Sequence, residues 1–282
     1  MTGRGGASIA GRRAGAGRAS RVAAWTRRLA GPLLLVALVA ALGNVGLLDA
    51  GRLTRGARNL WIFAGGLFPP DPSTLPTLLG AMLETIQIAF AGTAIGFAMA
   101  LPLALLGCPT LFGPSITGPV KLALAFTRTV PALFWAIVFV VAVGLGPAAG
   151  TLAIALYSQG YLGKLLYEAF DGVDPEVVEA VRSVGCGRAQ LACYAVLPEA
   201  ANAILAQLLF VFEYNVRASS IMGFVGAGGI GFYLLGYIQM LRYDLLVTGL
   251  LLTLAVVVLL DRLSALVRRL VLVRVTPAAP AE

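Results

Sequence analysis

Residues 179–198 read EAVRSVGCGRAQLACYAVLP and close a charged segment in a chain that is otherwise strongly apolar. Five of the thirteen acidic residues lie between Glu168 and Glu179, although only 12% of all residues are charged. A segment of this kind favours water, and long apolar runs flank it on both sides. We therefore expect residues 167–198 to form a water-exposed loop between two membrane segments, where a soluble partner docks.

The flanking sequence is typical of a membrane protein with several spans, since 59% of the 282 residues are hydrophobic. A bilayer core about 30 Å thick requires roughly 20 apolar residues for each helical crossing. The candidate runs are continuously apolar, which predicts helices and argues against the alternating strands of a membrane barrel. We therefore predict an all-α membrane protein with about six transmembrane helices. The predicted spans are Gly31–Leu48, Leu78–Leu106, Val120–Leu145, Ala148–Leu166, Glu199–Val216 and Leu245–Leu260.

Basic residues predict the orientation of these spans. Seven arginines precede the first span and four follow the last, so the positive-inside rule places both termini in the cytoplasm. Six crossings then place residues 167–198 in the cytoplasm as well. Arg52, Arg55 and Arg58 would face outward, and we interpret Leu53–Phe68 as an amphipathic helix lying at the membrane surface.

Four regions follow from this organisation. We expect a disordered, basic cytoplasmic arm at 1–24 and the first span with the interfacial segment at 25–77. The core is expected at 78–270, with the loop 167–198 inside it, and a short tail at 271–282.

Several function classes are excluded by what the sequence contains. The chain has no histidine, and its three cysteines have no metal-ligand spacing, so we expect neither a metal site nor catalysis. We expect the cysteines to be free thiols. The formal charge of +8 is spread over short loops, which favours membrane anchoring and not nucleic-acid binding.

A glycine-rich stretch, GAGGIG at 226–231, matches the dinucleotide pattern G-x-G-x-x-G. No strand precedes it and no acidic residue follows at the required distance, so we do not expect a nucleotide there. We expect a tight turn at the extracytoplasmic end, where missing side chains let backbones approach and let a gate move. Its glycines are Gly226, Gly228, Gly229 and Gly231. Elsewhere in the chain, Gly92 and Gly96 form a glycine pair with the spacing typical of a contact between helices.

The charged loop itself is patterned as two short helices. Asp174 is a suitable N-cap, Pro175 suits the first helical position and Gly185 is a natural stop, which predicts a helix over Pro175–Val184. A second helix is expected over Arg188–Val196. The valines Val177, Val178, Val181 and Val184 form an apolar stripe. That stripe either docks on a partner or packs against the helix ends of an ordinary cytoplasmic hairpin.

The loop resembles the coupling segment of the membrane subunits of ATP-binding-cassette importers. That segment reads Glu-Ala-Ala, three residues, Gly, nine residues, an aliphatic residue, one residue and Leu-Pro. This chain departs from it at Val181 and Ala195. The positions in register are Glu179, Ala180, Gly185, Leu197 and Pro198. The resemblance implies a type I importer permease fold and a coupling helix formed by Val177, Val178, Glu179, Ala180, Val181, Gly185, Leu197 and Pro198.

Shorter segments look like the phosphonate-transporter branch of this family. They are RTVP at 128–131, AVGLGP at 142–147, FEYNVRA at 212–218 and GFVGAGGIG at 223–231. The resemblance implies a prokaryotic inner-membrane protein without its own cofactor, whose ATP and Mg are bound by a partner. The implied partners are two copies of a cytoplasmic ATPase, a second copy of this chain and an extracytoplasmic substrate-binding protein.

Charged and polar residues within the spans are the candidates for the substrate pathway, because a buried ion requires a cavity or a partner. We predict Arg217, Glu213, Asn215 and Arg128 for this role. Glu213 and Arg217 are four residues apart and either orient an anion site or only neutralise each other. Arg128 contacts substrate or snorkels to headgroups. Pro131 is expected to kink the third span, and Glu84 is expected at the membrane interface.

We therefore expect a permease subunit of an ATP-driven importer for phosphonates or related small oxyanions, such as phosphate or phosphite. An importer permease for another small solute, such as an amino acid, is the main alternative. A secondary transporter would require coupling-ion carboxylates, which the spans lack, and a membrane scaffold that does not transport is a further alternative.

Overall fold

The computed structural model describes residues 30–272, so the predictions for the arm at 1–24 and for the tail from 273 onward lie outside it. The described part is helical throughout and forms two units, divided at Gly65 and Gly66. The fold class predicted from the sequence is confirmed.

The first unit contains two helices, Ala30–Asn44 and α2, Ala50–Gly66. The first helix overlaps the predicted first span from Gly31 to Asn44 but is only 15 residues long, counted from its bounds. Asp49 begins α2, because its carboxylate accepts hydrogen bonds from the backbone nitrogens of Gly51 and Arg52 at 2.9 and 3.1 Å. The helix expected near Leu53–Phe68 is therefore present, and its position at a membrane surface stays a prediction.

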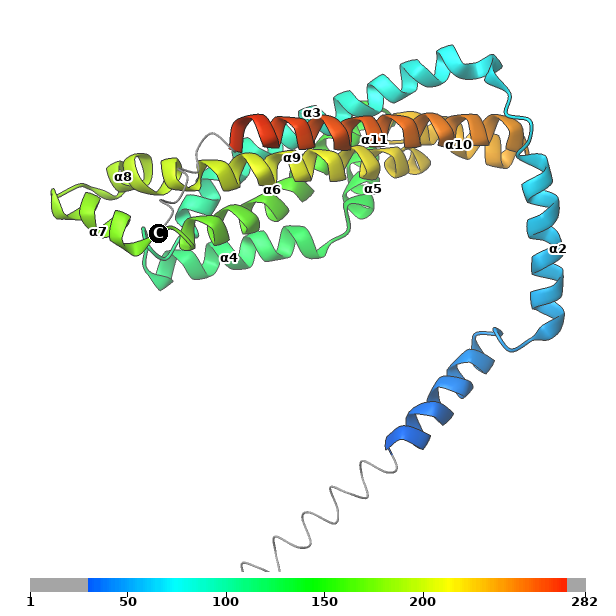
Figure 1. Cartoon of the computed structure of the whole chain (residues 1–282), viewed down its shortest axis with the longest axis horizontal. Coiled ribbons are helices and arrows are strands. Elements are labelled where there is room, and N and C mark those ends of the chain that lie inside the picture. Colours follow the sequence, from blue (N-terminus) through cyan, green and yellow to red (C-terminus); the bar gives the residue numbers. More distant parts are fainter. Residues whose placement is uncertain (1–29, 273–282) are drawn as a thin grey trace, which may run out of the picture. The chain divides into compact units, whose positions relative to one another are not determined.

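The second unit is a bundle of long helices with shorter ones at its ends (Figure 1). Its α-helices are α3 (Leu75–Leu106), α4 (Pro114–Thr129), α5 (Ala132–Val143), α6 (Pro147–Asp171), α7 (Pro175–Ser183), α8 (Arg188–Leu191), α9 (Leu197–Met222), α10 (Ile230–Gln239) and α11 (Tyr243–Leu272). Three short turns complete it: η1 (Pro72–Thr74), the π-helical η2 (Ala192–Val196) and η3 (Gly223–Val225).

The predicted third span is not one helix. α4 ends at Thr129, Val130 is extended with ψ 121°, and α5 begins at Ala132 with its axis bent by 84° from that of α4. Pro131 causes the break, because proline removes a backbone donor and disfavours helical geometry in the residue before it. The bend is therefore at the predicted residue, and it is much larger than the predicted kink.

Fewer helices than the six predicted are long and apolar enough to cross a membrane. Among residues 30–272, three helical stretches are long and apolar enough to cross a membrane, and a fourth is added if α4 and α5 count as one broken span. The three are Pro72–Leu106, Arg188–Val225 and Tyr243–Leu270. α6 has 25 residues, long enough to cross at about 1.5 Å per residue, but it carries polar side chains along its length.

α3 and α6 form the centre of this bundle, and the predicted glycine pair makes their contact. A Cβ at Gly96 would lie 2.7 Å from the Cβ of Ser158 and 2.8 Å from the carbonyl of Ala155. A Cβ at Gly92 would meet the side chain of Ile154 at 2.5 Å. The two helices therefore touch through their backbones, which the small-xxx-small spacing predicted.

A buried amide joins the third helix to this pair. Asn215 of α9 is fully buried, and its Nδ2 donates to Thr93 Oγ1 of α3 and to Ser158 Oγ of α6, both at 2.8 Å. Hydrogen bonds of this kind connect helices where no water is present. α3, α6 and α9 are thus held at one point by a polar contact in an apolar core.

This packing generates a prediction about two glycines of α3. Gly96→Leu forces a side chain into the backbone of α6, so we expect a loss of about 3 kcal/mol of folding free energy and a loss of monodisperse protein in detergent. Gly80→Leu is the matched control, because nothing lies within 4 Å of a Cβ at Gly80. Size-exclusion profiles and thermal unfolding of both variants would check this. Equal stability of the two would contradict the packing described.

Candidate functional site

The loop at 167–198 is a helical hairpin that joins the end of α6 to α9. Asp174 begins α7, since its side chain accepts a hydrogen bond from the backbone nitrogen of Glu176 at 2.9 Å. Gly185 ends the turn with a φ of +81°, in the left-handed region that glycine enters without strain. The first predicted helix is therefore confirmed with its cap and its stop.

The second predicted helix of the hairpin is not separate from the following span. α8 passes through the π-helical η2 directly into α9, so helical backbone continues from Arg188 to Val225 through the motif residues Leu197 and Pro198. Proline is tolerated at this place because it lies in the first turn of α9, where the hydrogen-bonding ladder changes. The hairpin and α9 therefore form one continuous element.

Three of the four valines in the predicted stripe face the protein, and the fourth, Val184, is exposed. Val178 is only 5% exposed, and Val177 and Val181 are half-buried against the core cluster that includes Phe170, so a direct role of these valines in docking stays a prediction. A helix of this amphipathic kind buries its apolar stripe on the nearest apolar surface, here the core cluster to which α8 and η2 contribute. The alternative of valines packed within their own hairpin is thus the one observed.

The opposite face of α7 and the turn after it remain exposed. Glu179, Ala180 and Gly185 lie on this surface, and Val184 is 76% exposed. We call these four residues the outer face of the hairpin.

Three cationic contacts fix the hairpin and its surroundings. Arg182 Nη2 donates to the carbonyl of Thr110 at 3.1 Å, and the guanidinium of Arg188 lies over the ring of Phe112. On α4, Lys121 lies over the ring of Tyr167, 4.6 Å from its centroid. The hairpin is therefore held to the loop between α3 and α4 and does not project freely.

The predicted ion pair between Glu213 and Arg217 is wrong. Glu213 Oε1 accepts from Arg268 Nη2 at 3.2 Å, and Arg217 Nη1 donates to Asp261 Oδ1 at 3.4 Å. Both partners lie on α11, which packs along α9 (Figure 1). Spacing along one helix predicted a local pair, whereas the tertiary contact provides each charge with its own partner on the neighbouring helix.

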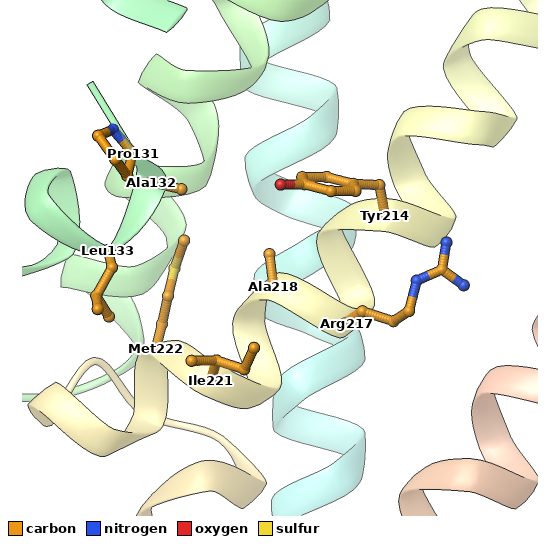
Figure 2. Close-up of a pocket in the computed structure, with 8 residues that line it drawn as sticks. All are labelled: Pro131, Ala132, Leu133, Tyr214, Arg217, Ala218, Ile221 and Met222. Carbon is orange, nitrogen blue, oxygen red and sulfur yellow. The ribbon is translucent and has the colours of Figure 1, made fainter. Parts of the chain in front are cut away.

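A cavity of about 350 Å³ lies between α9 and the start of α5. Tyr214 and Arg217 are its polar residues, but they point in different directions (Figure 2). The hydroxyl of Tyr214 points toward the cavity, while the guanidinium of Arg217 turns away from it (Figure 2), to Asp261. The complete lining is Pro131, Ala132, Leu133, Tyr214, Arg217, Ala218, Ile221 and Met222.

The other two predicted pathway residues have different surroundings. Asn215 is buried between α3, α6 and α9 and does not border this cavity. Arg128 is half-buried in the last turn of α4, one turn before the helix break. Within residues 30–272 no carboxylate pairs with Arg128.

The glycine stretch forms the turn between α9 and α10, as expected. Gly226, Gly228 and Gly229 have φ values of +80°, +84° and +76°. Gly231 lies so close to the carbonyl of Ser220 that no side chain fits there. A role of this turn in gating stays a prediction.

Two residues of α3 hold the start of α10, a contact that the sequence analysis did not predict. Glu84 Oε1 accepts from the backbone nitrogen of Gly229 at 2.9 Å, and Thr85 Oγ1 accepts from that of Ile230 at 2.8 Å. The pairs are 145 residues apart in the chain, so no local pattern indicates them. Glu84 therefore acts as a cap on another helix.

Comparison with known proteins places these features in a family. The family described as "Binding-protein-dependent transport system inner membrane component" matches residues 92–273. The phosphite transport system permease protein PtxC of Stutzerimonas stutzeri is 37% identical over 247 residues, which cover 87% of this chain and 90% of that protein. The phosphate-import permease protein PhnE of Mycolicibacterium smegmatis is 39% identical over 215 residues, 74% of this chain but only 40% of that longer protein.

Solved structures share the fold. A chain of the inward-facing MetNI methionine ABC transporter is 22% identical, with a TM-score of 0.63 over 71% of this chain and 98% of its own length. The architecture is thus that of type I importer permeases. The chain belongs to the family of inner membrane components of binding-protein-dependent transport systems.

Proposed function

We propose that this chain is the permease subunit of an ATP-driven importer of phosphonates or related small oxyanions, such as phosphate and phosphite. The hairpin α7–α8 carries the proposal, because it combines the motif residues, an exposed outer face and a continuous helical connection to α9. The substrate class is supported by the relatives named for phosphite and phosphate transport at 37% and 39% identity.

The partners follow from the outer face of the hairpin. We propose that it docks in a cleft of a separate cytoplasmic ATPase, which binds ATP and Mg, while this chain holds no cofactor. One chain carries one hairpin and the ATPase acts as a pair, so we propose a second copy of this chain with a second ATPase. A substrate-binding protein would deliver cargo from the extracytoplasmic side, and both termini would lie in the cytoplasm with the hairpin.

The geometry supports mechanical coupling between the ATPase and the cavity. The buried and half-buried valines Val177, Val178 and Val181 hold α7 in the core cluster, α7 packs against η2, which continues into α9, and α9 lines the cavity with Tyr214 and Ala218. Closure of the ATPase pair around ATP would draw the two hairpins together and tilt α9 with them, which turns the cavity outward. Hydrolysis would release the pair and reset it. The ATPase must bind the two states with different affinity for this cycle to run.

Competition experiments test the substrate class. Cells that express the complete importer should take up radiolabelled phosphate, phosphite or methylphosphonate in an ATP-dependent manner. Unlabelled oxyanions should compete, and an amino acid should not. Competition by the amino acid alone would replace the proposed cargo with the main alternative.

Glu179→Lys tests the docking role. Reversing a charge across a protein interface disfavours association by several kcal/mol, so we expect uptake to fall at least about tenfold while the amount of permease in the membrane stays the same. Asp171→Lys, an exposed position before α7, is the matched control and should keep uptake. Co-purification of the ATPase would be measured in parallel. Normal uptake and normal ATPase recovery with Glu179→Lys would refute this surface as the docking site.

Gly185 tests the shape of the hairpin separately from its charge. A valine at this left-handed position costs about 1–2 kcal/mol or more, whereas asparagine tolerates it. We expect Gly185→Asn to keep most uptake, and Gly185→Val and Gly185→Glu to lose it, although space is available for a Cβ. Uptake by the three variants at equal membrane levels checks this. Equal activity of the asparagine and valine variants would mean that the turn geometry is unimportant.

A further inference from the structure

Three tyrosines from two helices pack their rings together at the edge of the cavity. Tyr157 and Tyr161 are one turn apart on α6, and Tyr214 comes from α9. Their ring centroids are 6.0, 6.1 and 6.2 Å apart, and the ring planes lie within 24° of parallel. The cluster therefore brings three phenol groups together beside the cavity that Tyr214 lines.

Arg128 supplies a positive charge next to this cluster. It lies in the last turn of α4, which packs against α6, and among residues 30–272 no carboxylate forms an ion pair with it. Gly160 permits this approach, because a Cβ there would lie 2.9 Å from the backbone nitrogen of Arg128. Trp135 fixes the helix end in addition, as its Nε1 donates to the carbonyl of Thr127 at 3.1 Å. Packing thus places the backbone of Arg128 beside the turn of α6 that carries Tyr157 and Tyr161, and its guanidinium has no counter-charge among residues 30–272.

The helix break adds a second positive element at the same cavity. α5 begins at Ala132, and its first turn lines the cavity opposite Tyr214 (Figure 2). The first turn of a helix has unpaired N–H groups and the positive end of the helix dipole. The cavity of about 350 Å³ has room for about ten water molecules, so a small hydrated anion fits.

The depth of the cluster argues against a lipid contact. Tyr157 and Tyr161 are the eleventh and fifteenth of the 25 residues of α6, near its middle. Hydroxyls and a guanidinium at that depth lack partners in hydrocarbon and are costly there. They are accommodated where a polar pathway reaches them.

We propose that Arg128 and the hydroxyls of Tyr157, Tyr161 and Tyr214 form an oxyanion-binding site in the translocation pathway. This site rests on the proposed function, and it replaces Arg217 as the main anion contact, because Arg217 is paired with Asp261. Phenol hydroxyls donate hydrogen bonds that suit the oxygens of a small tetrahedral oxyanion, and the guanidinium matches two of them at once. The hydrogen bonds are donated by several separate hydroxyl groups and hold the anion weakly enough for it to leave again, as transport requires.

The test removes the hydroxyls and keeps the rings. The permease is reconstituted in liposomes with its ATPase, ATP and saturating substrate-binding protein, and transport of radiolabelled phosphate is measured with phosphite and methylphosphonate as competitors. We expect the triple variant Tyr157→Phe, Tyr161→Phe, Tyr214→Phe to transport at least about tenfold more slowly. Its ATP hydrolysis stimulated by the binding protein should stay within about twofold of the wild type, because the stacked rings still pack.

Matched variants separate the site from general effects. The double variant Tyr233→Phe, Tyr237→Phe removes two hydroxyls from α10, outside the cluster, and should transport normally. Arg128→Gln should lose transport as strongly as the triple variant, and Arg128→Lys should keep part of it. A cluster that only packs would leave transport unchanged without its hydroxyls.

Each outcome supports or overturns one statement. Wild-type protein that transports none of the three oxyanions would refute the proposed function. Wild-type transport that persists in the triple variant would refute the site and leave the function in place. If the triple variant does not assemble, the single variants Arg128→Gln and Tyr214→Phe decide the question, and normal transport by both would overturn the site.

Discussion

Backbone contact between α3 and α6 is the constraint on which the other positions depend. Gly92 and Gly96 let the two helices approach until side chains of α6 touch the backbone of α3. Asn215 then attaches α9 to this pair through two hydrogen bonds. In a membrane such contacts matter more than apolar burial, because lipid competes equally well for apolar side chains. The three helices form the scaffold that places the cavity, the tyrosines and the hairpin.

Two departures from regular helix lie at the two functional regions. The bend at Pro131 exposes the first turn of α5 to the cavity, and the π-helical η2 joins the hairpin to α9. Irregular backbone within a membrane protein is tolerated where it is buried in protein or lines a cavity. π-Helical turns are often found at functional sites, which agrees with the position of η2 at the root of the hairpin. α9 connects both regions, since one helix carries the motif residue Pro198 and the cavity residue Tyr214.

Local signals in the sequence predicted local structure well. Asp174 and Gly185 set the limits of α7 because capping and left-handed geometry depend on neighbouring residues. The partners of Glu213 could not be predicted, since Arg268 is 55 residues away and only the packing of α11 on α9 brings the two together. The stripe containing Val178 is evident in the sequence, but periodicity shows that a face is apolar and does not show which surface covers it. The oxyanion cluster could not be predicted for the same reason, because Tyr157 and Tyr214 meet only across two helices.

The ion pairs between α9 and α11 also bear on how the protein is made. Glu213 and Arg217 find their partners 55 and 44 residues later in the chain, on α11. A charge without a partner is costly within a bilayer, so α9 inserts into lipid less readily before α11 is present. Stable insertion of α9 therefore depends on a helix that is synthesised later than α9 itself.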